Sequence, residues 1–449
     1  MEPWIAIDAI EHRQSHHTLA ALHDLMWGRR ETVSVNGMFG DWSPITVHLD
    51  GEISVRDRST PYKGAMFAAY PGDVVFSKID ARNGAIGVLP AEIVKAVVTS
   101  EFPVFVSNPE KLDSHFVKLV LRTGGFLAAL RSKATGTSGR KRIKPEAFLD
   151  LRIPLPSLDQ QRAIVETYDA ALVDAAGKDR DADAIEAQAA RDFEAALGFG
   201  PPPPLPDRPI FIASFKDLDR WSHEGILRRV TGAPTSANTY PVVQLRDVIA
   251  DLENGWSPKC LDRPSKIDEW GVLKLGAVSF GVFDESENKA LPSHLKPRPA
   301  LEVKAGQVLI SRANITRLVG ATALIDQSRP HLMLCDKIFR VVYRDPSPID
   351  PKFIAEVLRI GDVRRQIESK LTGTSPTMKN ISKPALMSLT FPLPPLDEQR
   401  KLVDALAAAR TKAAALRRDA DAARVNGWTA FEAAVYAAES SPAMAAEAV

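Results

Sequence analysis

A ten-residue segment occurs twice in this chain and indicates that the chain is a duplicated unit. Residues 153–162 read IPLPSLDQQR, and residues 391–400 read FPLPPLDEQR. The copies lie 238 residues apart, and the same spacing relates FEAAL at 193–197 to FEAAV at 431–435. Surface loops tolerate insertions and deletions, so an unchanged length over some forty residues points to a rigid element. A helical spacer is the natural candidate.

Each copy carries the signals of a helix that begins after an extended segment. Two prolines at alternate positions hold the start of each copy extended, because proline fixes φ and disfavours helix at the residue before it. In the first copy, Ser157 and Gln160 have the spacing of a capping box. In the second, Pro395 suits a first helical position, and Asp397 and Glu398 favour the amino end of a helix.

Apolar residues recur at helical spacing after each start, and many of them are small. A helix over 159–197 would be about 58 Å long at about 1.5 Å per residue, which exceeds an ordinary core helix. The equal lengths favour two helices that pack against each other as a coiled coil. The alternative is two unrelated surface helices.

The composition is that of a soluble globular protein with two to four domains: 449 residues, 45% hydrophobic and 25% charged. No apolar run approaches the roughly 20 residues of a membrane span, and Met1 is not followed by a signal-peptide pattern. We therefore expect a cytoplasmic protein without a membrane segment. Cys260 and Cys335 have neither disulfide-framework nor zinc-ligand spacing.

The net charge of +1 conceals two opposite local charges. Residues 131–144 contain six bases and no acid, whereas residues 174–194 contain seven acids against three bases. Between 364 and 383, five bases stand against the single acid Glu368. Basic loops of this kind indicate a polyanion site more directly than the net charge does.

The first half has a strand pattern before its basic loop. Residues 71–79 (PGDVVFSKI) predict a Pro-Gly turn and an apolar strand, with further strands at 86–88, 96–99 and 104–106 and a helix over 114–131. The loop then contains TGTSG at 135–139. Exposed backbone N–H groups and hydroxyls suit contact with phosphate oxygens. A solvated turn explains the same residues equally well.

The second half repeats these features. Residues 306–312 (GQVLISR) echo 72–78 at a spacing of 234, and TGTS at 372–375 echoes 135–138 at a spacing of 237. Two basic loops on two similar domains suggest one extended ligand contacted twice. Residues 198–206 (GFGPPPPLP) read as a stiff linker between the halves. The segment PVVQLRDVI at 241–249 has no obvious counterpart near the amino end.

Motifs of the usual DNA-modifying and DNA-cleaving enzymes are missing from the sequence. There is no Gly-x-x-x-x-Gly-Lys-[Ser/Thr] phosphate loop and no Asn/Asp-Pro-Pro-Tyr tetrapeptide of an amino-methyltransferase. Residues 302–304 (EVK) match only the last part of a metal-nuclease signature. The nine histidines form no metal-ligand spacing. The sequence therefore predicts a chain that is not an enzyme and holds no metal.

The repeated PLPxLDxQR segment, the GDVVFSK strand at 72–78 and the two-fold organisation resemble the specificity subunit of type I restriction-modification systems. The resemblance extends over nearly the whole chain from about Gly64. It implies an α+β fold in which two repeated target recognition domains are separated by two long antiparallel helices that form a coiled coil. The implied segments are a first recognition domain at 1–152, a first spacer helix at 153–198, a Pro-rich linker at 199–209, a second recognition domain at 210–390, a second spacer helix at 391–440 and a flexible tail at 441–449.

The resemblance also implies the role of such a chain. It would be the non-catalytic subunit of a DNA methyltransferase and restriction endonuclease complex, with each half reading one part of a bipartite double-stranded DNA target. The helices would set the gap and dock two methyltransferase (M) subunits, which use S-adenosylmethionine. Restriction (R) subunits, which use ATP with Mg, would join for cleavage, and this chain would need no cofactor. The alternatives are a stand-alone nuclease or methyltransferase, and a coiled-coil scaffold without a DNA role.

Candidate DNA-binding residues follow from the chemistry of readout. Arg pairs best with guanine and Asn or Gln with adenine, which favours Lys78, Arg82 and Asn83 in one half and Arg312, Asn314 and Arg317 in the other; the alternative is solvated turn residues. The two TGTS loops suit phosphate rather than bases. The complete set is Lys78, Arg82, Asn83, Thr135, Gly136, Thr137, Ser138, Arg140, Lys141, Arg142, Arg312, Asn314, Arg317, Thr372, Gly373, Thr374, Ser375 and Lys379.

Overall fold

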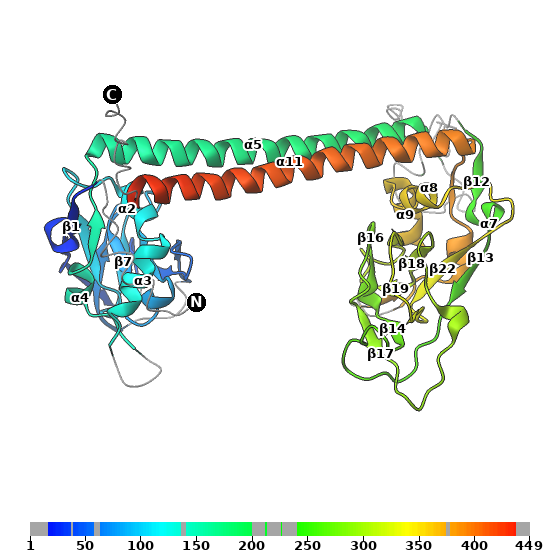
Figure 1. Cartoon of the computed structure of the whole chain (residues 1–449), viewed down its shortest axis with the longest axis horizontal. Coiled ribbons are helices and arrows are strands. Elements are labelled where there is room, and N and C mark those ends of the chain that lie inside the picture. Colours follow the sequence, from blue (N-terminus) through cyan, green and yellow to red (C-terminus); the bar gives the residue numbers. More distant parts are fainter. Residues whose placement is uncertain are drawn as a thin grey trace, which may run out of the picture. The chain divides into compact units, whose positions relative to one another are not determined.

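The computed structural model describes residues 17–36, 39–57, 63–135, 141–199, 212, 226, 240–373 and 378–436. The chain divides into two compact units: unit 1 is Met1–Arg180 with Leu416–Val449, and unit 2 is Asp181–Ala415. The division falls inside both long helices, α5 (Leu158–Ala196) and α11 (Leu396–Tyr436) (Figure 1). The two predicted long helices are thus confirmed as helices of 39 and 41 residues.

Unit 1 contains a four-stranded antiparallel sheet and a five-stranded mixed sheet. The first has four strands in the order β2-β10-β7-β8, namely β2 (Met26–Gly28), β10 (Val104–Ser107), β7 (Val74–Phe76) and β8 (Ile86–Val88). The second has five in the order β3-β6-β9-β4-β5, namely β3 (Thr32–Asn36), β6 (Lys63–Ala69), β9 (Ala96–Val98), β4 (Ser43–Val47) and β5 (Ile53–Val55). The strands predicted near 74–79, 86–88, 96–99 and 104–106 are confirmed as β7 to β10.

The single helix predicted over 114–131 is wrong, because two helices form there. They are α2 (Ser114–Val120) and α3 (Gly124–Ser132). Thr123 lies between them in an extended conformation, and its hydroxyl accepts a hydrogen bond from the Phe126 N–H at 3.3 Å, which caps α3. A third short helix, α4 (Pro145–Leu149), precedes strand β11 (Arg152–Pro154).

Unit 2 repeats the four-stranded sheet and the three short helices of unit 1. Its four-stranded sheet has the order β13-β22-β18-β20, with β13 (Ile249–Asn254), β22 (Ile338–Tyr343), β18 (Val308–Ser311) and β20 (Thr322–Leu324). Helices α8 (Pro351–Val357), α9 (Gly361–Ser369) and α10 (Lys383–Met387) follow in the order of α2, α3 and α4. The fold of the chain is α+β.

Several further strands of unit 2 are arranged differently from those of unit 1. They form a three-stranded sheet, β17 (Asn288–Ala290), β14 (Gly271–Leu273) and β21 (Leu332–Met333), the hairpin of β15 (Val278–Ser279) and β16 (Val282–Phe283), and the pair of β19 (Ala313–Asn314) and β23 (Lys379–Asn380). The units therefore share a frame but carry different additional sheets.

Residues near the amino end supply the counterpart of 241–249 that the sequence did not reveal. Strand β1 (Leu19–Ala21) pairs with β11, and strand β12 (Val242–Gln244) pairs in the same way with β24 (Thr390–Pro392). A short helix follows each: η1 (Leu22–Asp24) after β1, and α7 (Leu245–Val248) after β12. The strands had no recognisable common sequence, so only the pairing identifies them.

Helices α5 and α11 complete the core of each unit. In unit 1, Phe431 of α11 packs against Phe116 of α2 with ring centroids 6.2 Å apart, and Trp428 meets Tyr168 of α5 edge-on at 5.7 Å. A Cβ on Gly427 would lie 2.7 Å from the Cβ of Ala171, so the two helices approach closely there. The beginning of α5 therefore lies antiparallel to the end of α11 within unit 1.

In unit 2 the other ends of the helices meet. Phe193 of α5 packs against Phe353 of α8 with centroids 6.0 Å apart, and it shares a core cluster with Val403 and Leu406 of α11.

Among the residues described, no helix is both long and apolar enough to cross a membrane. The predicted linker after Phe199 and the predicted tail at 441–449 lie outside the described residues.

Candidate nucleic-acid interface

In unit 1, Lys78, two residues after strand β7, lies beside the point where the two ends of the basic loop pair, which we call its neck. The Lys78 N–H donates to the Glu101 carbonyl at 3.0 Å, and the Lys78 carbonyl accepts from the Ile143 N–H at 2.8 Å. Thr135 and Arg142 close the neck with two backbone hydrogen bonds of 3.0 and 2.9 Å. Lys78, Thr135 and Arg142 are therefore brought together, and Lys141 directly precedes Arg142 in the chain. Gly136, Thr137, Ser138 and Arg140 lie outside the described residues.

Unit 2 has the same arrangement at the equivalent positions. The Arg312 N–H donates to the Lys337 carbonyl at 2.8 Å, and the Arg312 carbonyl accepts from the Ile381 N–H at 3.0 Å. The neck is closed by backbone hydrogen bonds of 2.8 and 2.9 Å between Thr372 and Asn380. In both units, the structure thus joins the end of a strand to the basic loop of the same unit.

The pair of β19 and β23 adds to this junction in unit 2. Asn314 lies opposite Lys379 in the register, and the Lys379 ammonium donates to the Gly373 carbonyl at 2.6 Å. Gly373 has a φ of 109°, a left-handed conformation that glycine adopts without a steric cost. Thr374 and Ser375 lie outside the described residues.

The other candidates in unit 1 lie on the short helix η2 (Ala81–Asn83). Asn83 is exposed, and the Arg82 carbonyl accepts from Nε of Arg131 at 2.9 Å. This bond connects η2 to the end of α3, which is the start of the basic segment. The exposed amide of Asn83 is available to a ligand.

The two arginines predicted in unit 2 have different environments. Nη1 of Arg312 donates to the Asp336 carbonyl at 3.2 Å, and its guanidinium lies over the Phe339 ring, 5.5 Å from the centroid. Arg312 is therefore held within the unit. Arg317 is exposed, and its carbonyl accepts from Nη2 of Arg364 at 3.1 Å.

The five bases between 364 and 383 carry less free charge than the sequence suggested. Arg364 is 9% exposed, donates to the Val319 carbonyl at 2.6 Å and lies over the Phe280 ring, and burial lowers its pKa. Arg365 pairs with Asp362 and Lys383 with Asp251. The expectation of nearly uncompensated charge is therefore wrong for this segment, because sequence counting does not reveal burial or partners distant in the chain.

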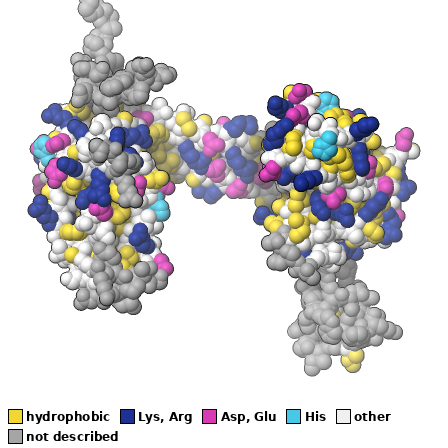
Figure 2. All heavy atoms as spheres, turned by 90° about the horizontal axis from the view of Figure 1, so that it is seen from below, with side chains coloured by type: hydrophobic (Ala, Val, Ile, Leu, Met, Phe, Trp, Pro, Cys, Tyr) yellow, Lys and Arg dark blue, Asp and Glu magenta, His cyan; other side chains and the backbone are white. Residues whose placement is uncertain are grey.

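The basic segment of unit 1 keeps more of its charge. Arg142 pairs with Glu101 at 3.1 Å, whereas Lys133, Lys141 and Lys144 are exposed and have no carboxylate partner within the described part of the chain. In the face drawn in Figure 2, basic side chains are scattered over each unit and mixed with acidic ones. No group of three or more His, Cys, Asp or Glu residues suited to a metal ion occurs among the described residues.

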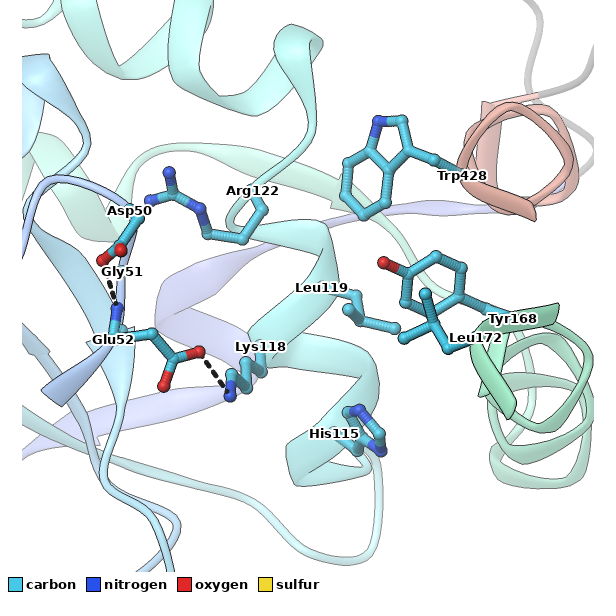
Figure 3. Close-up of a pocket in the computed structure, with 11 residues that line it drawn as sticks. Asp50, Gly51, Glu52, His115, Lys118, Leu119, Arg122, Tyr168, Leu172 and Trp428 are labelled. Carbon is cyan, nitrogen blue, oxygen red and sulfur yellow. Dashed lines mark hydrogen bonds and ion pairs between the residues drawn. The ribbon is translucent and has the colours of Figure 1, made fainter. Parts of the chain in front are cut away.

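A cavity of about 340 Å³ lies elsewhere in unit 1, beneath the long helices (Figure 3). Its charged lining groups are engaged: Lys118 pairs with Glu52 at 3.0 Å, and Arg122 donates to the carbonyls of Gly84 and Leu49 at 2.6 and 3.1 Å. Its lining is Asp50, Gly51, Glu52, Gly87, His115, Lys118, Leu119, Arg122, Tyr168, Leu172 and Trp428. The predicted DNA-binding residues do not line it.

No protein-family model matches the chain. The chain is 26% identical over 369 residues to the EcoEI type I restriction enzyme specificity subunit of Escherichia coli, a match that covers 69% of this chain and 62% of that subunit. It is 24% identical over 289 residues to the MjaVIII specificity subunit of Methanocaldococcus jannaschii, with 62% and 59% covered. The chain thus spans about three fifths of the length of the curated relatives it matches.

Two solved structures share the fold. The HsdS subunit from Thermoanaerobacter tengcongensis matches with a TM-score of 0.51 and 18% identity over 94% of this chain and 96% of that chain. A chain from a structure titled for complex assembly and conformational transition of the type I R-M system matches with a TM-score of 0.54 and 16% identity, covering 93% and 97%. The curated sequence matches and the common fold agree: the chain is similar to type I restriction enzyme specificity subunits.

Proposed function

We propose that this chain is the DNA sequence-specificity subunit of a type I restriction-modification complex. The observation that carries the proposal is the repeated junction: the Lys78 carbonyl bonds to Ile143 in unit 1, and the Arg312 carbonyl bonds to Ile381 in unit 2. Each junction joins a strand end to a loop with lysine and hydroxyl side chains. Such groups bind phosphates, whereas side chains at strand ends can reach base edges.

The two units read the two parts of a bipartite double-stranded target. Lys133, Lys141 and the TGTS loops contact phosphate, and Asn83, Asn314 and Arg317 are exposed or half-buried groups that can contact bases. The four-stranded sheet is common to the units, but the additional sheet has five strands in unit 1 and three in unit 2. A common frame with different additional sheets suits two readers of different sequences.

Helices α5 and α11 form an antiparallel coiled coil that sets the distance between the two reading surfaces and docks two methyltransferase subunits. Their 39 and 41 residues correspond to about 58 and 62 Å at about 1.5 Å per residue. The chain supplies no catalytic group. The methyltransferase subunits use S-adenosylmethionine as the methyl donor. Restriction subunits, when they join, use ATP with Mg.

The test is a domain exchange in the assembled complex. Residues 1–152 are replaced by the matching domain of a relative, the hybrid is produced with its methyltransferase partner, and methylated adenines are mapped in cellular DNA. We expect one half of the target to change while the other half and the gap persist. A change in both halves would contradict two independent readers, and methylation or cleavage by the purified chain alone would favour the stand-alone enzyme.

A further inference from the structure

A proline-stiffened basic loop in unit 2, residues 291–301 (LPSHLKPRPAL), was not among the residues that the sequence pattern singled out. It contains three prolines, the bases Lys296 and Arg298, and no acid. Proline fixes φ and leaves fewer conformations to lose on binding. A turn in which the Leu295 N–H donates to the Pro292 carbonyl at 2.9 Å orders its first part.

The second part of this loop is held to the central sheet by a buried arginine. Arg340 of β22 is 9% exposed and donates to the carbonyls of Ala300 and Glu302 at 2.9 and 2.8 Å. Its guanidinium also pairs with Glu253 of β13. The Leu334 N–H donates to the Leu301 carbonyl at 2.9 Å. These bonds hold the loop backbone firmly next to Arg298, the residue whose side chain extends from it.

Arg298 is exposed, and its guanidinium lies over the Trp256 ring with Cζ 4.1 Å from the centroid. Its N–H donates to the Met333 sulfur at 3.2 Å, and its side chain has no carboxylate partner in the part of the chain that the structure describes. Stacking on an aromatic face fixes the plane of a guanidinium and leaves the donors at its edge unused. Two parallel N–H donors at the edge of a guanidinium match the O6 and N7 acceptors of guanine in the major groove.

A continuous series of contacts connects Arg298 to the junction described above. Trp256 is followed by Ser257, whose hydroxyl hydrogen-bonds with Asp336. The Asp336 carbonyl accepts from Arg312 at 3.2 Å, and the Arg312 carbonyl accepts from Ile381. These contacts link Arg298 to the loop that begins at Thr372. Arg312 donates to the Asp336 carbonyl within this series, whereas the Arg298 guanidinium stacks on Trp256.

We infer that Arg298, oriented by Trp256, reads a guanine in the half of the DNA target recognised by unit 2. The inference rests on the proposed function, and it names a specificity-determining residue of that site. The competing explanation is a phosphate contact, which would also use a cation on this surface. The two differ in what a lysine can replace, because lysine keeps the charge but lacks the planar pair of donors.

The experiment uses the full chain assembled with its methyltransferase subunits and a panel of duplexes in which each base pair of the wild-type target is changed in turn. Binding is measured at several salt concentrations for wild type, Arg298→Ala, Arg298→Lys and Trp256→Leu. Arg263→Ala is the matched control, because that exposed arginine already donates both arms to Glu269 at 2.6 and 2.8 Å.

We expect Arg298→Ala to lose preference for one G·C pair in one half-site by about tenfold to a hundredfold. Arg298→Lys should lose the same preference while the salt dependence stays that of wild type, and Trp256→Leu should lose part of it. Arg263→Ala should behave as wild type. Equal weakening on every duplex by Arg298→Ala, or wild-type preference in Arg298→Lys, would overturn base reading. A wild-type complex without any sequence preference would instead overturn the proposed function.

Discussion

Oε1 of Gln399 accepts a hydrogen bond from the backbone N–H of Asp350 at 2.8 Å. Its Nε2 donates to the carbonyls of Pro348 and Pro394 at 3.0 and 2.8 Å, and the side chain is fully buried. Gln399 therefore connects the first turn of α11 to the cap of α8, because Asp350 is the N-cap of that helix.

Gln161 makes the same three hydrogen bonds in unit 1. Its Oε1 accepts from the Asp113 N–H at 2.9 Å, and its Nε2 donates to the carbonyls of Lys111 and Pro156 at 2.8 and 2.9 Å. Asp113 caps α2. The glutamine of the repeated PLPxLDxQR segment is therefore a fixed joint between a globular domain and a long helix, and this explains the repetition of the motif.

The first prediction concerns this joint. Gln399→Met keeps the side-chain volume but leaves one N–H and two carbonyls at the joint without their partner, so we expect a loss of roughly 2–4 kcal/mol in the free energy of unfolding. Gln161→Met should behave similarly, and thermal or denaturant unfolding measures both. Gln188→Met is the control, since Gln188 is exposed on α5 and should change little. An unchanged melting temperature in both joint variants would contradict the role.

The second prediction uses a difference between the units. Glu356 of α8 pairs with Arg410 of α11 at 2.6 Å, whereas the equivalent residues of unit 1 are Leu119 and Leu172, which line the cavity in Figure 3. Arg410→Leu leaves a carboxylate that is only 16% exposed with Arg359 alone. We expect the free energy of unfolding to fall by roughly 1–2 kcal/mol. The effect is smaller than for a fully buried pair, because Arg410 is 41% exposed and solvent screens its charge.

The double variant Glu356→Leu with Arg410→Leu should recover part of that loss, since a leucine pair replaces the ion pair as in unit 1, while Arg359 loses its pairing with Glu356. A double-mutant cycle from denaturant unfolding measures the coupling. If the double variant were as unstable as the sum of the single ones, the two sites would not be equivalent in packing.

The third prediction concerns the basic loop of unit 1. Changing Arg140, Lys141 and Arg142 to Ala should weaken DNA binding of the assembled complex at every sequence. The salt slope should fall by about one unit for each phosphate that the variant no longer neutralises. Arg142 should contribute least, because it pairs with Glu101. The methylated sequence should stay the same. Wild-type affinity and salt dependence in the triple variant would exclude this loop from the DNA.

The fourth prediction concerns the spacer. Removing residues 178–184 from α5 and 416–422 from α11 keeps the heptad phase and shortens each helix by about 10 Å. Because B-DNA advances about 3.4 Å for each base pair, the gap in the target should shrink by about three base pairs with both half-sites kept, or activity should be lost because one half-site rotates by nearly a third of a turn. Methylation of the original target with an unchanged gap would refute the spacer role.

The sequence by itself determined the elements whose signals are local. Proline positions, cap residues and apolar periodicity were sufficient for the two long helices and for strands β7 to β10, because these signals lie within a few residues of the element. The 238-residue spacing disclosed the duplication of the helices. A spacing of 237 residues placed the two TGTS loops at equivalent positions, and the structure joins each loop to the end of a strand.

Tertiary structure decided what depends on partners distant in the chain. The pairing of β1 with β11 had no sequence signal, because a three-residue strand is specified by its partner more than by its own residues. Arg364 counted as free charge in the sequence, yet it is buried against Val319 and Phe280. Arg298 gave no motif, because its orientation comes from Trp256, 42 positions earlier in the chain. Burial and stacking are properties of the folded chain, and local sequence does not contain them.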